Sequence, residues 1–178
     1  MPNPENKMER IKLIFRYLMN LEWTEKIQHY CIFCDRANFG GIAYEDDDLI
    51  AIHNIRSAGQ LHWLIMPKSH VARDIESLNG EHIALLQAMD RVKQHLLASH
   101  CPGVSPTDVH SGYHRGRRPL VAGIYYPDIV SIHHLHLHVI VKPRAWLRFF
   151  KYPGWLPLMW RSDVAVLRRV QRLAAKVT

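Results

Sequence analysis

The segment His134-Leu135-His136-Leu137-His138-Val139-Ile140 alternates three histidines with aliphatic residues. Side chains point alternately to the two faces of a β-strand, so a strand over residues 129–141 would place the three imidazoles on one face and the aliphatic side chains in a core. A buried imidazole needs hydrogen-bond partners, which makes three of them on one face costly as structure alone. The row therefore favours metal ligation or nucleophilic and acid–base chemistry over three structural histidines.

Composition limits the class of protein. With 178 residues, 48% of them hydrophobic, the chain is long enough for one domain with its own core and needs no disulfides to fold. Its three cysteines are an odd number and two of them form a C-x-x-C, so we expect no disulfide framework. We find no apolar run of membrane-spanning length and no signal-peptide core, which predicts a cytoplasmic or nuclear protein. The net charge of +7 favours anionic partners such as nucleotides, nucleic acid or acidic lipid surfaces.

Hydrophobic periodicity and turn residues predict short strands and three amphipathic helices. The expected strands, besides 129–141, cover residues 42–45, 49–55, 62–66 and 109–114. The expected helices cover residues 5–21, 81–97 and 164–176, with Asn79 as a cap of the second and irregular structure over 144–163. Because strands outnumber helices and connect locally, we expect an α+β fold with an antiparallel sheet. The predicted organisation is an N-terminal accessory helix (1–30), a central domain (31–143) and a C-terminal extension with a basic helix (144–178).

The alternating histidines match the signature of the histidine-triad superfamily at every position from 134 to 140. Other motifs resemble that superfamily in order and spacing: Cys31-Ile-Phe-Cys34, Leu49-Ile-Ala-Ile-His-Asn-Ile55, His62-Trp-Leu-Ile-Met-Pro-Lys-Ser-His70 and Ser131. The resemblance covers roughly residues 31–141. Gly112-Tyr113-His114 and the C-terminal segment are most similar to the branch that holds aprataxin and the third type of histidine-triad nucleotide-binding protein.

The resemblance implies an enzyme that cleaves a nucleotide through a covalent nucleotidyl-histidine and needs no organic cofactor. His136, the middle histidine, would attack the α-phosphate, and a neutral imidazole is a good nucleophile near neutral pH. His138 and His62 would hold the phosphate oxygens or orient the nucleophile, and Ser131 would lie near the leaving group. The residues implied to contact the nucleotide, besides His138, are His53, Asn54, Ile55 and His114. Many members carry aspartate in place of Asn54, which leaves the substrate preference open.

The preferred substrate is AMP joined to an amine, so the predicted enzyme is an adenosine 5′-monophosphoramidase acting on a purine nucleotide. Three alternatives stay open: hydrolysis of dinucleoside polyphosphates, aprataxin-like removal of AMP from a DNA 5′ end, and a regulatory module that binds nucleotides with little turnover. No cysteine follows the triad in this sequence, so it holds no cysteine-containing zinc finger there, and we expect no specific nucleic-acid partner. Members are often homodimers through the long helix and the sheet edge, and we expect a homodimer here.

Cys31 and Cys34 have the spacing of half a zinc site, although a lone C-x-x-C also suits a redox pair or core sulfur. In the related galactose-1-phosphate uridylyltransferases and in some bacterial triad proteins, a similar pair joins a histidine after the second strand and the first triad histidine. The matching residues here are His70 and His134. The resemblance therefore implies a structural Zn²⁺ with four protein ligands and no open position for catalysis. The alternative is a reduced, metal-free pair with His70 on the surface.

Residues 115–128 are an apparent insertion relative to the superfamily. They contain Arg115, Arg117 and Arg118. One interpretation is a solvated loop. The other is a basic lip over the nucleotide site, because the guanidinium fork suits phosphate. His133, next to the triad, is expected to face the opposite way and to take no part in catalysis.

Overall fold

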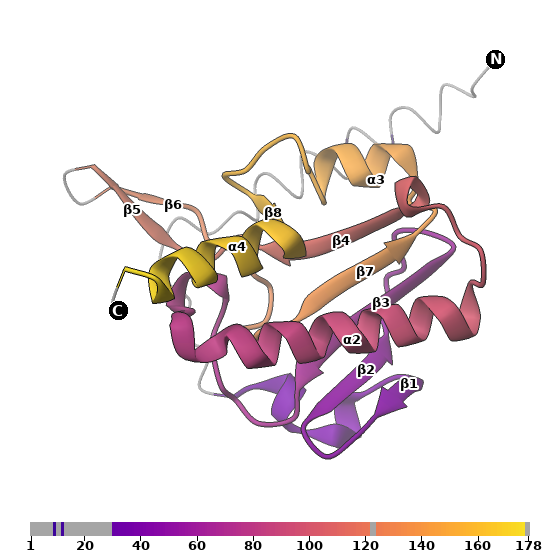
Figure 1. Ribbon diagram of the computed structural model, residues 1–178. Coiled ribbons are helices and arrows are strands. Elements are labelled where there is room, and N and C mark those ends of the chain that lie inside the picture. The colour runs from indigo at the N-terminus through magenta and orange to yellow at the C-terminus, as the bar shows by residue number, and fades with distance from the viewer. Residues whose placement is uncertain (1–8, 10–11, 13–29, 122–123, 177–178) are drawn as a thin grey trace.

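The sheet at the centre of the molecule has six antiparallel strands in the order β1-β2-β3-β7-β4-β8 (Figure 1). Its strands are β1 (Ile42–Glu45), β2 (Leu49–His53), β3 (Leu61–Pro67), β4 (Val109–His114), β7 (Leu137–Val141) and β8 (Trp160–Ser162). The computed structural model describes residues 30–121 and 124–176, together with Glu9 and Lys12. The helix predicted over 5–21 and the accessory segment 1–30 lie almost entirely outside the described residues. The predicted α+β fold with an antiparallel sheet is confirmed.

Two helices cover one face of this sheet. α2 (Ile83–His100) follows the short 3-10 helix η4 (Gly80–His82), where the side chain of Asn79 accepts a hydrogen bond from the Glu81 amide (3.1 Å) and acts as the predicted cap. Beside it lies α4 (Asp163–Ala174), close to the predicted 164–176. The buried residues of the two helices are Leu86, Met89, Val92, Lys93, Leu96, Val166 and Val170. Among the described helices, none has the length and apolar character needed to cross a membrane.

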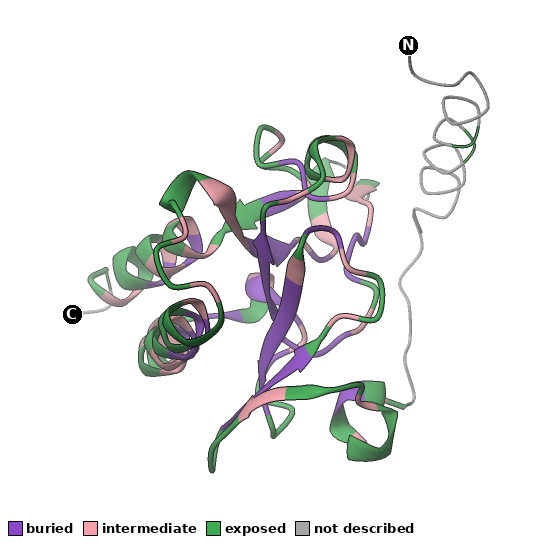
Figure 2. Cartoon of the chain, turned by 90° about the vertical axis from the view of Figure 1, so that its right-hand side faces the viewer, coloured by how far each residue is buried: buried purple, intermediate pink, exposed green. Residues whose placement is uncertain are grey.

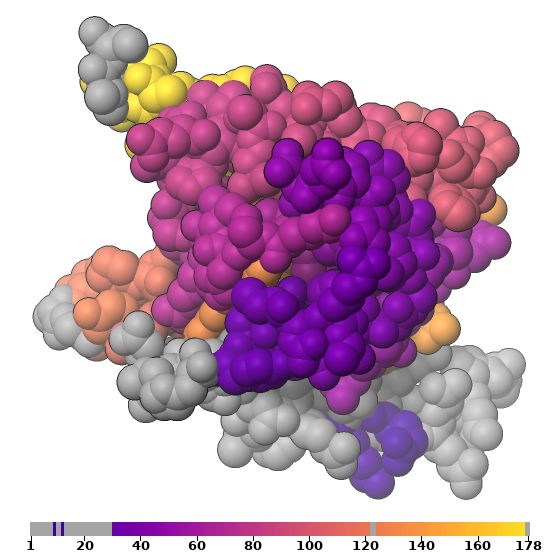
Figure 3. Space-filling view, turned by 90° about the horizontal axis from the view of Figure 1, so that it is seen from below, coloured from indigo at the N-terminus to yellow at the C-terminus, as the bar shows by residue number. Residues whose placement is uncertain are grey.

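Side-chain alternation gives the sheet two different faces. The residues that face the helices form the main core, and they include Ala51, Trp63, Ile65, Leu137, Val139 and Val141. The opposite face carries the register pairs His62–Ile140 and Leu64–His138, with smaller clusters around them. Figure 2 shows the buried strands at the centre and exposed residues on the outer sides of the helices. Seen from below, the surface is made largely by the first described third of the chain, with α2 along one side (Figure 3).

β7 is much shorter than the strand predicted over 129–141. Residues 131–134 bend, and the Leu135 amide donates to the carbonyl of Ala72 (2.8 Å) instead of joining a strand. Only Leu137–Val141 pairs with β3 and β4. Histidines and aliphatic residues still alternate at positions 134–136, but the backbone there is not paired in the sheet. His134 instead turns toward the sulfur atoms of Cys31 and Cys34.

The segment after β7 is more regular than predicted. The structure has α3 (Ala145–Phe150) and β8 where irregular chain was expected. β8 pairs with β4, and the contact is so close at Gly112 that a Cβ there would lie 2.3 Å from the carbonyl oxygen of Arg161. β8 therefore closes the edge of β4, and α4 continues from it onto α2. The division of the chain at residue 143 stays a prediction.

The basic insertion forms a hairpin whose base is fixed by ion pairs. β5 (Arg118–Val121) pairs with β6 (Ile124–Tyr126), and the hairpin projects from the body of the domain (Figure 1). Within it, the guanidinium of Arg117 lies over the ring of Tyr125, 3.7 Å from the ring centre. This is a cation–π contact that occupies Arg117 inside the hairpin.

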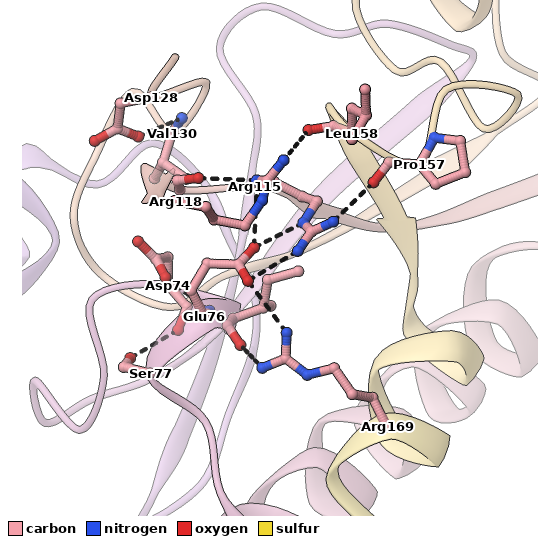
Figure 4. Close-up of polar contacts among 12 residues, drawn as sticks. Asp74, Glu76, Ser77, Arg115, Arg118, Asp128, Val130, Pro157, Leu158 and Arg169 are labelled. Atoms are coloured by element: carbon pink, nitrogen blue, oxygen red, sulfur yellow. Dashed lines mark hydrogen bonds and ion pairs between the residues drawn. The ribbon is translucent and has the colours of Figure 1, made fainter. Parts of the chain in front are cut away.

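Glu76, on the 3-10 helix η3 (Ile75–Ser77), binds three arginines from distant parts of the chain (Figure 4). Arg115 donates to both carboxylate oxygens (2.7 and 2.9 Å), while Arg118 and Arg169 lie 3.5 and 3.2 Å from the same group. The side chains of Arg115 and Arg118 are only 12% and 11% exposed. The hypothesis of a basic lip is therefore wrong for these two residues, because their charge is used inside the protein. The remaining short helices are η1 (Ile32–Cys34), η2 (Arg36–Asn38) and η5 (Pro106–Asp108).

Replacing Glu76 by glutamine should lower the free energy of unfolding by on the order of 2 kcal/mol, because three guanidinium groups that are largely buried would lose their common counter-charge. Burial alone would raise the pKa of Glu76, but the hydrogen bonds of Arg115 and the nearby arginine charges lower it. The stabilisation is present above the unfolded pKa and is lost as pH falls through the lowered folded pKa. Urea unfolding at pH 7 measures the effect. Exposed Glu81→Gln is the matched control, and equal stability of the two variants would contradict the prediction.

Candidate active site

A cavity of about 550 Å³ lies on the histidine face of the sheet. It is lined by residues from separate parts of the sequence: the loop around Phe33, the end of β2, residues 128–132, His136 and His138, and the segment after α3. The predicted site residues Asn54, Ile55, His114 and Ser131 also line it. The volume is in the range of small-ligand sites, so the fold brings most of the predicted residues to one place.

A backbone amide sets the tautomer of His62. The N–H of Ala58 donates to Nδ1 of His62 (3.2 Å), so the proton of the neutral ring is on Nε2. That nitrogen lies 3.0 Å from Nδ1 of His138 and donates to it. Burial, and next the positive charge of Lys151, lower the pKa of His62 to about 3. The ring is therefore neutral at pH 7.

His138 must then carry its own proton on Nε2. Burial holds the pKa of His138 well below its ordinary value, and its Nδ1 is occupied by His62. Its Nε2 is buried and has no hydrogen-bond partner among the described residues. Nδ1 of His114 is in the same situation, and the two rings pack edge to face with 4.9 Å between their centres. A buried N–H without an acceptor at the wall of a cavity is suited to bind a phosphate oxygen.

His136 has the opposite arrangement of proton and lone pair. Its Nδ1 donates to the carbonyl oxygen of His134 (2.6 Å), which leaves Nε2 unprotonated. Burial lowers the pKa of His136 to about 4, so the lone pair stays available at neutral pH. The rings of Phe33 and His138 contact the imidazole at 5.3 and 4.8 Å between centres. His136 therefore has the position and protonation that a nucleophile needs.

The first histidine of the row, His134, belongs to a separate cluster. Its Nδ1 lies 3.4 Å from the sulfur of Cys31 and 3.6 Å from that of Cys34, whose sulfur is 3.5 Å from Nδ1 of His70. The four ligand atoms lie within 4.8 Å of one another. One sulfur and one nitrogen on a tetrahedral Zn²⁺ would be about 3.5 Å apart, given the usual bond lengths. The predicted residues therefore form a cluster that could hold a metal ion.

A second contact orients His134 for such a role. Its Nε2 donates to the carbonyl oxygen of Pro67 (2.8 Å), so Nδ1 is unprotonated and faces the two sulfur atoms. Metal-binding histidines are commonly held by a hydrogen bond from the other ring nitrogen in this way. His134 is fully buried, whereas Cys34 and His70 are exposed, so the cluster reaches from the interior to the surface.

The residues predicted to bind the nucleotide divide into two groups. The Asn54 side chain accepts from the Arg56 amide (2.9 Å), and its Nδ2 is 3.3 Å from His62, while Ile55 is 88% exposed at the rim. His53 differs, because alternation along β2 turns its ring to the helix face, 6.4 Å from the ring of Trp63. His53 nevertheless borders the cavity, and the prediction that it contacts the nucleotide stays a prediction.

Comparison with known proteins agrees with this geometry. Residues 28–147 match the family described as "Scavenger mRNA decapping enzyme C-term binding". The adenosine 5′-monophosphoramidase HINT3 of Xenopus tropicalis is 33% identical over 123 residues, which are 67% of this chain and 71% of the relative. The chain belongs to the histidine-triad superfamily.

Other members of the histidine-triad superfamily extend the comparison. Aprataxin of Danio rerio is 30% identical over 97 residues, 54% of this chain but only 25% of aprataxin. Among solved structures, a HIT family hydrolase from Clostridium thermocellum superposes with a TM-score of 0.50 and 25% identity, over 65% of this chain and 92% of that one. The chain is thus a histidine-triad hydrolase of the branch that includes HINT3 and aprataxin.

Several residues of this histidine-triad site were not found from the sequence. Tyr152 is 1% exposed and its ring contacts those of His62, His114 and His138 at 5.1–5.5 Å. Lys151 beside it lines the cavity. No motif identifies this lysine–tyrosine pair, which follows the triad in a segment predicted to be irregular.

A second group that the sequence analysis missed holds the loop over the cavity. His133, predicted to lie away from the triad face, is buried, and its Nε2 donates to the carboxylate of Asp128 (2.9 Å), which also pairs with Arg73. Asp128 accepts a further hydrogen bond from the Val130 amide (3.1 Å). The loop that carries Ser131 is therefore fixed by Asp128, and the prediction that His133 is not catalytic stays untested.

The buried neutral histidines predict that stability falls in mild acid. The folded pKa of His62 is about 3, against about 6.5 in an unfolded chain, so below pH 6.5 only the unfolded chain takes up this proton. The free energy of unfolding should decrease steadily as pH drops from 7.5 to 5. Urea unfolding across that range tests this. In His62→Gln the decrease should be shallower, in exposed His95→Gln it should match the wild type, and a pH-independent wild type would refute the prediction.

Proposed function

We propose that this chain hydrolyses AMP–N bonds, as an adenosine 5′-monophosphoramidase, through a nucleotidyl group on His136. The observation that carries the proposal is the pair of opposite tautomers at the cavity wall: an unprotonated Nε2 on His136 next to an N–H on His138 that has no acceptor among the described residues. The first can attack phosphorus while the second holds a non-bridging oxygen. The name of the Xenopus tropicalis relative supports the same activity.

The proposed reaction has two steps that balance. The lone pair of His136 Nε2 forms a bond to the α-phosphorus as the bond from phosphorus to the amine nitrogen breaks, and the amine leaves with a proton from water in the cavity. The carbonyl of His134, 2.6 Å from Nδ1, stabilises the positive charge that develops on the ring. Water then attacks phosphorus, and the bond from phosphorus to His136 Nε2 breaks. The proton that this water loses replaces the one given to the amine, so the net reaction consumes one water and gives AMP and a free amine. Splitting the reaction in this way lowers each barrier.

The alternative substrates are less well supported. The aprataxin match covers a quarter of that protein, and Arg115 and Arg118 are bound to Glu76, so they do not offer a phosphate-binding surface to DNA. Hydrolysis of dinucleoside polyphosphates would use the same His136 chemistry with a phosphate as the leaving group. A nucleotide-binding module without turnover would not need the unprotonated Nε2 in the cavity.

Substituting His136 by alanine should abolish hydrolysis of adenosine 5′-phosphoramidate while the protein stays folded and still binds AMP. Mass spectrometry of wild-type protein quenched during turnover should find an added AMP moiety on the peptide that contains His136. The exposed His95→Ala variant on α2 should keep the wild-type rate and adduct. An adduct on another histidine, or substantial turnover by His136→Ala, would overturn the assignment.

We also propose that Cys31, Cys34, His70 and His134 hold one structural Zn²⁺. The sulfur–nitrogen distances of 3.4–3.6 Å and the orientation of His134 by Pro67 support this. Four protein ligands complete a tetrahedral site, so the ion would brace the loop that carries Phe33 against His136 and would not act on the substrate.

Protein purified without chelators should contain about one zinc per chain by elemental analysis, the stoichiometry of a closed four-ligand site. Cys31→Ser should lose the metal and melt at a lower temperature, since metal binding to the folded state contributes directly to stability. Cys101→Ser removes the one cysteine outside the cluster and should retain the zinc. Metal-free protein that melts at the same temperature with and without added zinc would disprove the site.

The expected homodimer and the cytoplasmic or nuclear location remain proposals. The edge of β4 is paired with β8, and α4 lies against α2, so residues of the same chain cover part of the helix and edge through which related proteins dimerise. The outer side of β1 is the other end of the sheet. Sedimentation analysis would distinguish a monomer from a dimer.

A further inference from the structure

α3 and the loop after it carry an exposed aromatic patch that lies outside the residues lining the cavity. Its members Phe149, Phe150 and Trp155 are 52%, 40% and 59% exposed. The ring of Phe149 stacks on that of Trp155 with 5.1 Å between centres, and meets that of Phe150 edge to face at 4.9 Å. The indole N–H of Trp155 also donates to the Phe149 carbonyl (3.0 Å). Single exposed apolar residues are common, but large rings that touch one another at the surface indicate a binding surface.

The fold holds this aromatic patch on a fixed support. Leu147, on the inner side of α3, packs against the buried cluster of Ala58, Ile140, Tyr152 and Trp160. The Arg144 amide donates to the Ala58 carbonyl (2.9 Å), which fixes the start of the helix on the domain. Figure 1 shows α3 at the edge of the molecule, beyond β4 and away from α2. The patch is therefore presented outward by a helix that the core anchors.

The charge around the aromatic patch has one sign. Between Asp128 and Asp163 the sequence contains five basic residues and no aspartate or glutamate. Arg144, Arg148 and Lys151 are spaced by four and three residues, which places them along one side of α3. Arg144 and Arg148 are exposed, and neither side chain forms an ion pair or a hydrogen bond with the described residues. The surface thus presents uncompensated cations beside exposed rings.

This combination favours one kind of partner. A second copy of this chain would bring its own uncompensated cations against the same surface, and like charges repel. A single-stranded nucleic acid would stack its bases on ring faces, but Phe149 and Trp155 already cover one face of each other. An anionic lipid bilayer suits both features, because aromatic rings settle at the level of the headgroups while cations attract acidic headgroups.

We propose that α3 and the loop after it dock this protein on the surface of a bilayer that contains anionic phospholipid. Phe149, Phe150 and Trp155 enter the headgroup layer, and Arg144 and Arg148 bind the acidic headgroups beside them. The protein then lies on the bilayer without crossing it. The proposal is independent of the reaction at His136 and adds a second surface to the one that holds the histidines.

Flotation of the full-length protein with lipid vesicles tests the role of charge. Vesicles of phosphatidylcholine alone are compared with vesicles in which roughly a third of the lipid is phosphatidylserine. Wild-type protein should bind the phosphatidylserine vesicles more than about tenfold more tightly, and added salt should weaken this binding. The double variant Arg144→Gln, Arg148→Gln should lose most of the difference, since each cation near an anionic surface contributes about fivefold.

Entry of the rings into the bilayer has a separate signature. Acyl-chain-brominated phosphatidylcholine in the phosphatidylserine vesicles should quench part of the tryptophan fluorescence of the wild type. Trp155→Phe keeps an aromatic ring, so it should bind within about twofold of the wild type but lose most of the quenching. The double variant Phe149→Ser, Trp155→Ser should bind about tenfold more weakly, because it removes apolar area that the bilayer would cover.

A matched control lies on another helix. Arg168 and Arg172 of α4 are exposed and have the same spacing as Arg144 and Arg148, so the double variant Arg168→Gln, Arg172→Gln loses the same charge and should bind vesicles as the wild type does. An equal loss of binding in the two double variants would overturn the proposal and assign the binding to net charge alone. Equal binding of the wild type to both kinds of vesicle, or to neither, would also overturn it.

Two further outcomes would assign the aromatic patch to a different partner and contradict the proposal. One is a dimer in sedimentation that Phe149→Ser with Trp155→Ser dissociates. The other is binding of a single-stranded DNA oligonucleotide that needs Arg144 and Arg148 and occurs without vesicle binding. Melting temperatures of all variants check that they fold, and the quenching test on Trp155→Phe, a conservative change at an exposed position, stays decisive if the serine variants do not.

Discussion

The hydrogen bond from the Ala58 amide to His62 fixes where the protons lie on His62 and His138. A backbone N–H cannot change its role, so Nδ1 of His62 must accept, and the proton on Nε2 in turn forces His138 to present an N–H. Burial of these rings prevents protonation, which would break the sequence of donors and acceptors. The loop before β3 therefore arranges His62 and His138 as much as do the strands that carry them, β3 and β7.

The alternating triad combines two tasks in one short segment. His136 faces the cavity, whereas His134 belongs to the cysteine–histidine cluster and offers its carbonyl to His136. A movement of the cluster would therefore shift His136 through the carbonyl of His134. It would also shift His136 through Phe33, which stands between the two cysteines in the sequence and packs on the His136 ring. The bend at residues 131–134 makes this division possible, because a continuous strand would have kept His134 in the sheet.

The sequence predicted the sheet, the long helix and the assembly of His62, His136 and His138 with good accuracy, because alternation and helical periodicity are local signals that tertiary packing reinforces. The cluster of Cys31, Cys34, His70 and His134 was implied by the family resemblance, because the C-x-x-C spacing alone left other roles open. The length of β7 was wrong because residue alternation cannot show where backbone pairing ends. The role of Arg115 and Arg118 could not be predicted either, since Glu76 precedes them by a helix and a strand. Lys151 and Tyr152 reach the cavity only through the path of the chain after β7, and no local pattern reports such a path.

The sheet order has a consequence for how this chain acquires its structure during synthesis. β1, β2 and β3 can pair as a local meander. The second neighbour of β3 is β7, which is synthesised only after α2, β4 and the hairpin of β5 and β6. Until then the edge of β3 presents unpaired amides and carbonyls, an arrangement that invites pairing with other chains. Non-local pairing of this kind also slows folding. A ribosome-bound chain that ends before residue 141 would therefore lack both a completed core and the histidine site. We expect the nascent chain to be most prone to aggregation between the synthesis of β3 and that of β7.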